Sequence, residues 1–250
     1  MLILLPAFLT AAGLSYIQGR YKDVRESVNA WLPSHDDAFG RFEVAPEMPV
    51  SLPALPYAID ALEPDISEDT LKHHHGTHEQ RYLRRTWGIL EMSPAQRTSQ
   101  DWSDLAYNAN AVLLHELYWA SMKPMERNTP VPMVIERRIR KDFGSMDRLQ
   151  AELFAVAKGL RGSGWVMLAW SPSLNRLVLL PIRNHNEGGL LGSIPLVVLD
   201  VWEHAWYLDR ASDQDEYLRA FWRRIDWDQA RKRLTKALRV TDPTLGSLIA

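Results

Sequence analysis

The second half of the chain contains an apolar run that ends in a carboxylate. Residues 194–199 read Ile-Pro-Leu-Val-Val-Leu, Asp200 follows directly, and His204 comes at the start of the next element. We interpret the run as a buried strand. A carboxylate at the end of such a strand is costly unless it is paired or bound to a metal. Any fold of this chain must therefore supply Asp200 with a partner.

Further histidines lie on two predicted helices of the first half. His74, His78 and Tyr82 are four residues apart, so on a helix they project from one face. Incidental histidines on a polar helix face would show the same spacing. His115 lies in an otherwise apolar stripe, where a hydrogen-bonded core histidine is more common than a metal ligand. Spacing alone leaves these alternatives open.

Composition restricts the kinds of site. The chain has no cysteine, which excludes disulfides and thiolate ligands, so any metal must be bound by His, Asp or Glu. Three imidazoles from these segments, together with the Asp200 carboxylate, would form a set suited to iron, manganese or zinc. With 46% hydrophobic residues, 24% charged residues and a formal net charge of −2, the composition is typical of a soluble protein with a core.

No feature favours nucleic acid as a partner. The net charge is negative, and the basic run at 137–141 has no interleaved aromatic residues. We interpret that run as a solvated helix face.

The order of predicted elements favours an α+β fold. In the first half we expect helices over 67–90 and 102–121, with a polar loop at 93–100 and a proline-containing linker at 123–132. These elements predict an N-terminal antiparallel α-helical hairpin.

The second half alternates between helix and strand. We expect a helix over 134–161 broken near 143–145, strands at 164–170, 176–182 and 194–202, and closing helices at about 203–210 and 214–239. This pattern predicts a C-terminal α/β domain with a three-stranded antiparallel sheet. The predicted domains are an N-terminal extension of unknown role at 1–47, the α-hairpin domain at 48–130 and the α/β domain at 131–250.

The extension begins with an apolar stretch at 1–14. It is too short to span a bilayer comfortably, and no Lys or Arg precedes it. An N-terminal helix or leader is the plainer interpretation, and a membrane contact or export through residues 1–14 is the alternative. The compartment is undecided, with cytoplasm or mitochondrion favoured.

Six motifs, in consistent order from about 50 to 235, resemble those of the iron/manganese superoxide dismutases. The most specific is Asp200-Val-Trp-Glu-His-Ala205. The others are Ser51–Ala58 followed by Asp60–Pro64, His74-x-Gly-x-His78, His115-x-x-Tyr118-Trp119, Asp142–Ser145 and Gly162–Trp165.

The resemblance implies a metal site and a reaction. It assigns His74, His115, Asp200 and His204 as the protein ligands of one Mn or Fe ion per chain, with solvent as the fifth ligand. The implied activity is the disproportionation of superoxide to oxygen and hydrogen peroxide. The oxidised metal would take an electron from one superoxide, and the reduced metal would return it to the next.

The same resemblance implies roles for groups around the metal. His78 and Tyr82 match the pair that lines the substrate channel, and an aromatic wall is expected from Trp119, Trp165 and Trp202. A homodimer is implied through Glu203, His204 and Tyr207.

Two regions depart from the family pattern. The family places a glutamine beside the metal-bound solvent. This glutamine comes from either of two sequence positions in the family. One corresponds to Ala111, which cannot replace it, and the other to His185, which can still hydrogen-bond the solvent. We therefore predict that His185 takes this role, and the choice between iron and manganese stays open.

The channel mouth differs more. Two positions that are usually cationic in the family correspond here to the uncharged Thr77 and Gln214. Glu79 and Asp215 add formal negative charge nearby. Losing cationic guides would slow association with an anionic substrate about tenfold or more at low salt. Arg81 and Arg210 are the candidates to compensate.

Two alternative functions remain at this point. The altered channel and the extension would suit a non-catalytic structural or interaction protein on the same fold, although all four ligand positions are intact. A mononuclear iron oxygenase would need two histidines and a carboxylate, and the third histidine leaves less room for substrate and oxygen together.

Overall fold

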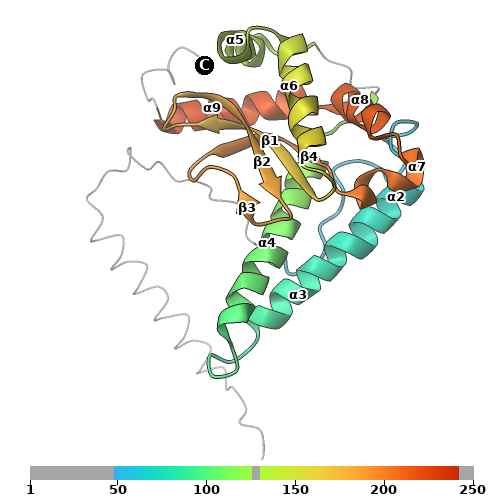
Figure 1. Cartoon of the computed structure of the whole chain (residues 1–250), viewed down its shortest axis with the longest axis vertical. Coiled ribbons are helices and arrows are strands. Elements are labelled where there is room, and N and C mark those ends of the chain that lie inside the picture. The colour runs from blue at the N-terminus through green and yellow to red at the C-terminus, as the bar shows by residue number, and fades with distance from the viewer. Residues whose placement is uncertain (1–47, 126–129, 242–250) are drawn as a thin grey trace, which may run out of the picture. The chain divides into compact units, whose positions relative to one another are not determined.

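The computed structural model describes residues 48–125 and 130–241 (Figure 1). The predicted extension at 1–47, including its apolar start, lies outside the described residues. Within the described residues, no helix is both long and apolar enough to cross a membrane.

A helical hairpin forms the first part, as predicted. One arm consists of α2 (Glu68–His73), η1 (His74–Glu79) and α3 (Gln80–Leu90), and the other is α4 (Ser99–Trp119). Helices α3 and α4 lie side by side (Figure 1). The first arm begins where predicted, because the Ser67 hydroxyl accepts a hydrogen bond from the Thr70 amide at 3.1 Å.

Helix α4 begins three residues earlier than the predicted Trp102. Thr98 and Asp101 form a capping box, in which the Thr98 amide donates to the Asp101 carboxylate at 2.6 Å and the Asp101 amide donates back to the Thr98 hydroxyl at 3.3 Å. These bonds satisfy backbone donors at the helix start and move it into the polar loop.

The first arm contains a wide turn that the sequence analysis did not predict. Residues His74–Glu79 form a π-helix, and the Gln80 amide donates to the His75 carbonyl five residues earlier. Such single wide turns inside α-helices often occur at functional sites. Here the turn carries His74 and His78.

The second part begins with two helices divided at the predicted place. Helix α5 (Met133–Phe143) ends at Gly144, whose φ of 89° is readily adopted only by glycine. Helix α6 (Met146–Gly159) follows at once, because the Ser145 hydroxyl accepts from the Arg148 amide at 3.0 Å.

The three predicted strands form an antiparallel sheet. They are β1 (Gly164–Ser171), β2 (Arg176–Arg183) and β4 (Ile194–Asp200), and the strand order is β3-β2-β1-β4. The fourth strand, β3 (Glu187–Gly188), was not predicted. It forms because Asn184, at φ 50°, turns the chain back so that Gly188 pairs with Ile182.

Strand β1 lies between β2 and β4 and is buried along its whole length. Helix α4 packs against β4, and so does α9 (Trp227–Thr241), while α6 packs against β1 and β2. The contact between α4 and β4 brings the hairpin to the end of the strand that carries Asp200. After β4 come η3 (Glu203–Ala205), α7 (Tyr207–Arg210) and α8 (Gln214–Arg224).

Polar contacts join the two parts of the fold. The guanidinium of Arg224 on α8 donates to the Asp65 carboxylate at 2.6 Å and to the Glu63 carbonyl at 2.7 Å, just before α2. Asp209 on α7 accepts from the Ser67 amide at 3.0 Å. The start of the hairpin arm is thereby fixed against the elements that follow β4.

Candidate metal centre

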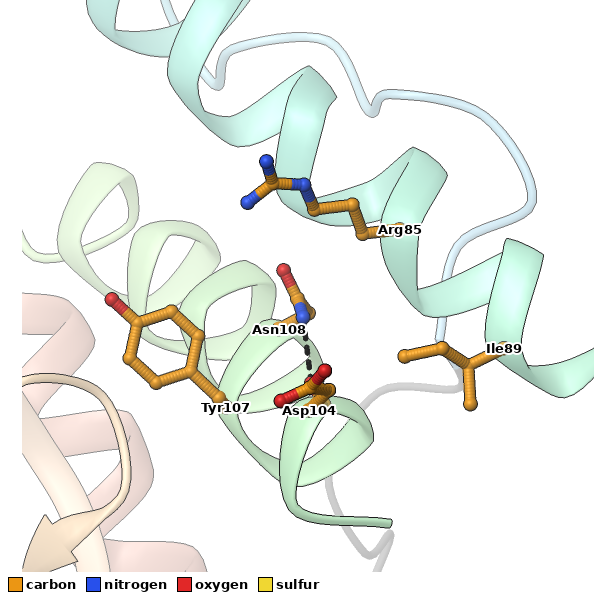
Figure 2. A pocket seen from close by; sticks show the side chains of 5 residues that line it. All are labelled: Arg85, Ile89, Asp104, Tyr107 and Asn108. Atoms are coloured by element: carbon orange, nitrogen blue, oxygen red, sulfur yellow. Dashed lines mark hydrogen bonds between the residues drawn. The ribbon is translucent and has the colours of Figure 1, made fainter. Parts of the chain in front are cut away.

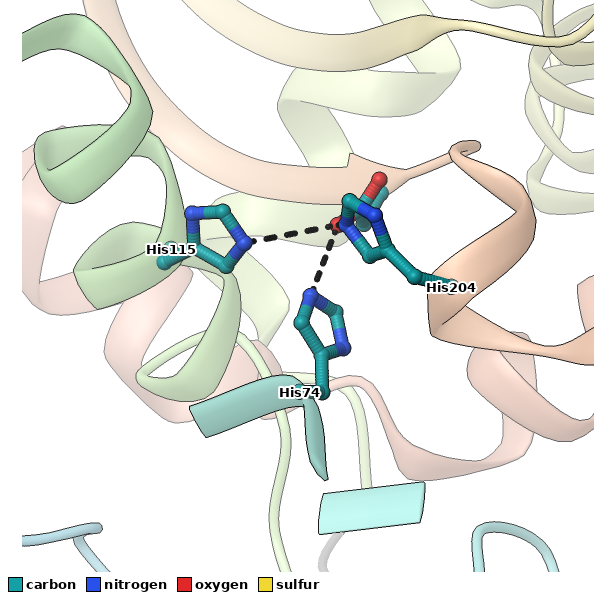
Figure 3. A group of neighbouring side chains, drawn as sticks. His74, His115 and His204 are labelled. Carbon is teal, nitrogen blue, oxygen red and sulfur yellow. Dashed lines mark ion pairs between the residues drawn. The ribbon is translucent and has the colours of Figure 1, made fainter. Parts of the chain in front are cut away.

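Four predicted ligands meet at one point. One donor atom from each of His74, His115, Asp200 and His204 lies within 4.8 Å of the others. They come from η1, α4, the last residue of β4 and η3, and Figure 3 shows the three imidazoles around the carboxylate oxygen. The Asp200 Oδ2 atom is 3.0 Å from His74 Nε2, 3.4 Å from His204 Nε2 and 3.9 Å from His115 Nε2.

Local hydrogen bonds leave the donor atoms free for a metal. His115 Nδ1 donates to the Ala111 carbonyl one turn earlier at 2.6 Å, so its Nε2 is unprotonated in the neutral ring. Asp200 Oδ1 accepts from the Trp202 amide at 2.8 Å, which leaves Oδ2 for other partners. Such contacts fix the orientation of metal ligands.

The donor set fits a metal ion. The Nε2 atoms of His74, His115 and His204 and the Oδ2 atom of Asp200 are buried and have no hydrogen-bond partner in the protein. Leaving each buried polar atom unpaired costs about 1–3 kcal/mol. Three imidazole nitrogens and one carboxylate oxygen are a suitable set for iron or manganese, so a bound ion would satisfy all four atoms at once.

The charge states also suit metal binding. Burial lowers the pKa of His74 to about 4 and lowers the pKa of His115 well below its ordinary value. Both rings are therefore neutral at pH 7, as metal ligands must be. Burial acts to raise the pKa of the Asp200 carboxyl, but the nearby imidazoles of His204 and His74 outweigh it and hold that pKa below its usual range. Asp200 is therefore ionised.

Only one of three consecutive histidines faces the centre. His73 is exposed, and the Nε2 atom of His75 lies 2.8 Å from the Pro53 carbonyl, to which it donates. His74 alone is buried beside Asp200.

Tryptophans surround the ligands as expected. The Trp119 ring lies 4.8 Å from the His74 ring, Trp165 lies 4.9 Å from His115, and Trp202 stacks on His204 at 5.5 Å, measured between ring centroids.

His185 lies beside the centre and has a defined tautomer. The indole N–H of Trp165 donates to His185 Nδ1 at 3.0 Å, so the remaining ring proton is on Nε2. Burial lowers the pKa of His185 to about 3, which keeps the ring neutral. The Nε2 atom is buried and has no partner in the protein.

His78 and Tyr82 line the site from the first arm. The His78 ring stacks on the His204 ring at 4.5 Å and is partly exposed to solvent. The Tyr82 ring lies 5.8 Å from His115 and 4.9 Å from His185, between ring centroids. Burial raises the pKa of Tyr82 to about 12. Both residues thus lie next to the ligands.

Tyr107 is a neighbour that the sequence analysis missed. Its ring lies 4.6 Å from His185 and 6.3 Å from Tyr82. It lines a cavity of about 500 Å³ together with Arg85, Ile89, Asp104 and Asn108. Figure 2 shows these side chains on α3 and α4. The position of Tyr107 two turns before His115 on α4 is the signal that could have revealed it.

The two acidic residues that were expected to add negative charge at the channel mouth do not do so. Glu79 is buried, and burial together with a hydrogen bond to Glu116 raises its pKa to about 9, so it is protonated at neutral pH. Asp215 forms an ion pair with Lys158 at 2.5 Å. The expectation that Glu79 and Asp215 add negative charge at the mouth is therefore wrong, because one is neutral and the other is paired.

The sequence matches two domain families. Residues 50–123 match the alpha-hairpin domain of the iron/manganese superoxide dismutases. Residues 132–233 match the C-terminal domain of the same enzymes. The chain belongs to the iron/manganese superoxide dismutase family. The predicted fold class is confirmed with it.

Named relatives of this family cover both metals. The chain is 38% identical to superoxide dismutase [Mn] 1 of Halobacterium salinarum over 74% of this chain and 95% of the relative. It is 35% identical to superoxide dismutase [Fe] of Pyrobaculum aerophilum, over 75% of this chain and 93% of the relative. Superoxide dismutase [Mn/Fe] of Propionibacterium freudenreichii is 33% identical, over 75% of this chain and 97% of the relative. The prediction of an iron or manganese dismutase is confirmed at the level of the family.

Proposed function

We propose that this chain is a superoxide dismutase with one iron or manganese ion bound by His74, His115, Asp200 and His204. The observation that carries the proposal is the convergence, within 4.8 Å, of four buried donor atoms that have no hydrogen-bond partner, in a member of this family. When bound, the metal would supply the one-electron oxidation of one superoxide and the one-electron reduction of the next.

The protein residues would control solvent and protons around that site. His185 Nε2–H has no protein acceptor, so it is available to donate a hydrogen bond to solvent held at the metal. The Tyr82 hydroxyl, with its pKa raised to about 12, stays protonated at neutral pH and adds a second donor. Reduction of superoxide to hydrogen peroxide consumes two protons, which would reach the site through solvent that these two donors orient.

We assign His78 and Tyr82 as the residues that line the substrate path. His78 supports this role because it is partly exposed on one side and stacks on the ligand His204 on the other. The division into domains at 48–130 and 131–250 is likewise part of the proposal.

The proposal includes a homodimer formed through Glu203, His204 and Tyr207. Tyr207 and the adjacent Leu208 are 58% and 61% exposed, and Glu203 is also exposed, next to the metal ligand His204. An exposed aromatic and aliphatic pair beside a functional site suits a protein interface. A mass measurement by light scattering, with Glu203→Ala and Tyr207→Ala as variants, tests this part.

The deciding experiment measures metal content and dismutase activity of the chain purified after growth with iron or with manganese. We expect about one redox metal per chain, with activity that His204→Ala abolishes, and the active preparation would identify the metal. Bound metal without activity would contradict the proposed reaction. Absence of metal in both preparations would favour a non-catalytic protein on the same fold.

A further inference from the structure

Arg81 contacts the exposed side of the site through a single, well-defined hydrogen bond. Its Nη2 atom lies 2.9 Å from Nδ1 of His78, one turn earlier on the first arm. A guanidinium group has donors only, so Nδ1 of His78 must be the acceptor. Neutral His78 therefore carries its proton on Nε2. The contact fixes the tautomer of this ring.

The same contact places a permanent positive charge next to the ligands. The His78 ring stacks on His204 with an interplanar angle of 25°, so only one imidazole ring separates the guanidinium from a ligand. Arg81 forms no ion pair with any carboxylate in the described ranges 48–125 and 130–241. Its charge is therefore not neutralised by a contact there.

The other candidate cation is used elsewhere. Arg210 donates to the carbonyls of Pro64 and Asp65, at 3.3 Å and 2.8 Å, and so fixes the start of the first arm. The two carboxyls that were expected to add negative charge at the channel mouth do not oppose Arg81, since Glu79 is neutral and Asp215 is paired with Lys158.

We propose that Arg81 is a positioning residue that both guides an anionic substrate to the site and holds His78 as an Nε2–H donor. This inference rests on the proposed function. It explains how the chain can lack a cation at Thr77 and Gln214 and still attract an anion. Charge near a site raises association rates by tenfold or more, and salt removes the effect.

Two substitutions separate the charge from the hydrogen bond. Arg81→Gln removes the charge but keeps an amide N–H that can donate to His78, whereas Arg81→Lys keeps the charge. Arg84→Gln is the matched control. Arg84 is exposed on the same helix, and its substitution changes the net charge by the same amount. All are measured on the full-length, metal-loaded chain.

We expect Arg81→Gln to lower kcat/KM about tenfold at low ionic strength and to flatten its dependence on salt. Arg81→Lys and Arg84→Gln should stay within about twofold of the unsubstituted chain. Adding Thr77→Lys to Arg81→Gln should restore both the rate and the salt dependence, because residue 77 is exposed next to His78. An unchanged rate and salt dependence in Arg81→Gln would overturn the guiding role.

Two further readouts do not depend on turnover. Affinity for azide, an anion of the same charge, should fall about tenfold in metal-loaded Arg81→Gln at low salt. In the metal-free chain, ¹⁵N NMR should show His78 as the Nε2–H tautomer, and Arg81→Ala should give a mixture. A tautomer unchanged by Arg81→Ala would overturn the positioning role.

The readouts also distinguish two failures. If the metal-loaded chain is inactive, the proposed function fails. Azide affinity and the His78 tautomer would then still decide whether Arg81 attracts anions and orients the ring.

Discussion

The indole N–H of Trp119 donates a 2.7 Å hydrogen bond to Oε2 of Glu79. The bond joins α4 to the wide turn η1, and the Trp119 ring also lies against the ligand His74. Because Glu79 is buried and its pKa is raised to about 9, this carboxyl is a neutral hydrogen-bonding group rather than a surface charge. Through this bond Glu79 holds the Trp119 ring, which packs against His74.

Glu79 should make the stability of the metal-free chain depend on pH. Its pKa in the folded chain, about 9, exceeds its ordinary value of 4.5, so the folded state binds the proton more tightly. The associated stability is fully present below about pH 4.5 and is lost as the pH rises to 9. Glu79→Gln cannot lose a proton. We therefore expect the free energy of unfolding of Glu79→Gln, relative to that of the unsubstituted chain, to increase as the pH rises. Urea unfolding of both at pH 5, 7 and 9 measures this difference.

The control is Glu152→Gln, at an exposed ion pair with Arg148. Its curve should run parallel to that of the unsubstituted chain between pH 5 and 9. A parallel curve for Glu79→Gln as well would show that Glu79 is ionised in the folded chain.

Asp200→Asn should remove most of the bound metal. The amide has nearly the same shape but lacks the charge that attracts the ion, and its nitrogen cannot act as a ligand. We expect metal content below about a tenth of the unsubstituted level by mass spectrometry, with an unchanged circular dichroism spectrum. Asp69→Asn, at a side chain 76% exposed, should bind metal normally. Full metal content in Asp200→Asn would exclude Asp200 as a ligand.

Trp165→Phe should lower activity without removing the metal. The substitution deletes the N–H that fixes the His185 tautomer, while most of the packing is kept. Loss of such supporting contacts typically costs about 10–100-fold. Activity per bound metal is the measurement. Trp170→Phe, on the same buried strand but with an indole N–H that bonds nothing in the protein, controls for packing. Equal losses in both variants would contradict a role for the Trp165–His185 bond.

The contact between Asp65 and Arg224 should dominate the polar contribution to stability. Both side chains are almost fully buried and lie 2.6 Å apart. Arg224→Met leaves a buried carboxylate with a weaker set of partners, and breaking such pairs typically costs about 3–5 kcal/mol. Arg223→Met removes a more exposed partner of the same carboxylate and should cost at most about 1 kcal/mol. Urea unfolding measures both, and similar costs would show that burial of Arg224 adds nothing.

The sequence was sufficient to select the four candidate ligands that the fold brings together, and to place most element boundaries. Asp200 follows a buried strand, and the helix break at Gly144 and Ser145 depends on local rules of capping and glycine conformation that are visible in the residues. The start of α4 was misplaced because the capping box of Thr98 and Asp101 was overlooked, although it too is local.

Other features depend on tertiary contacts and could not be predicted. Formal charge at Glu79 follows from its residue type, but its neutrality follows from burial against α4. The contact between Tyr107 on α4 and His185, two residues after the end of β2, joins segments far apart in the sequence and exists only in the folded chain. Short strand β3 depends on the left-handed conformation of Asn184, which its residue type permits without requiring it.

The wide turn at 74–79 also affects how the first arm can vary. A π-turn holds one residue more than the α-helical turn it replaces, so α2 and α3 are out of phase by one position. If the same residues were wound as a regular α-helix, all that follows would rotate by about 100°. Tyr82 would then face away from His185. The wide turn itself, as well as the residues that it carries, is therefore a constraint on the site.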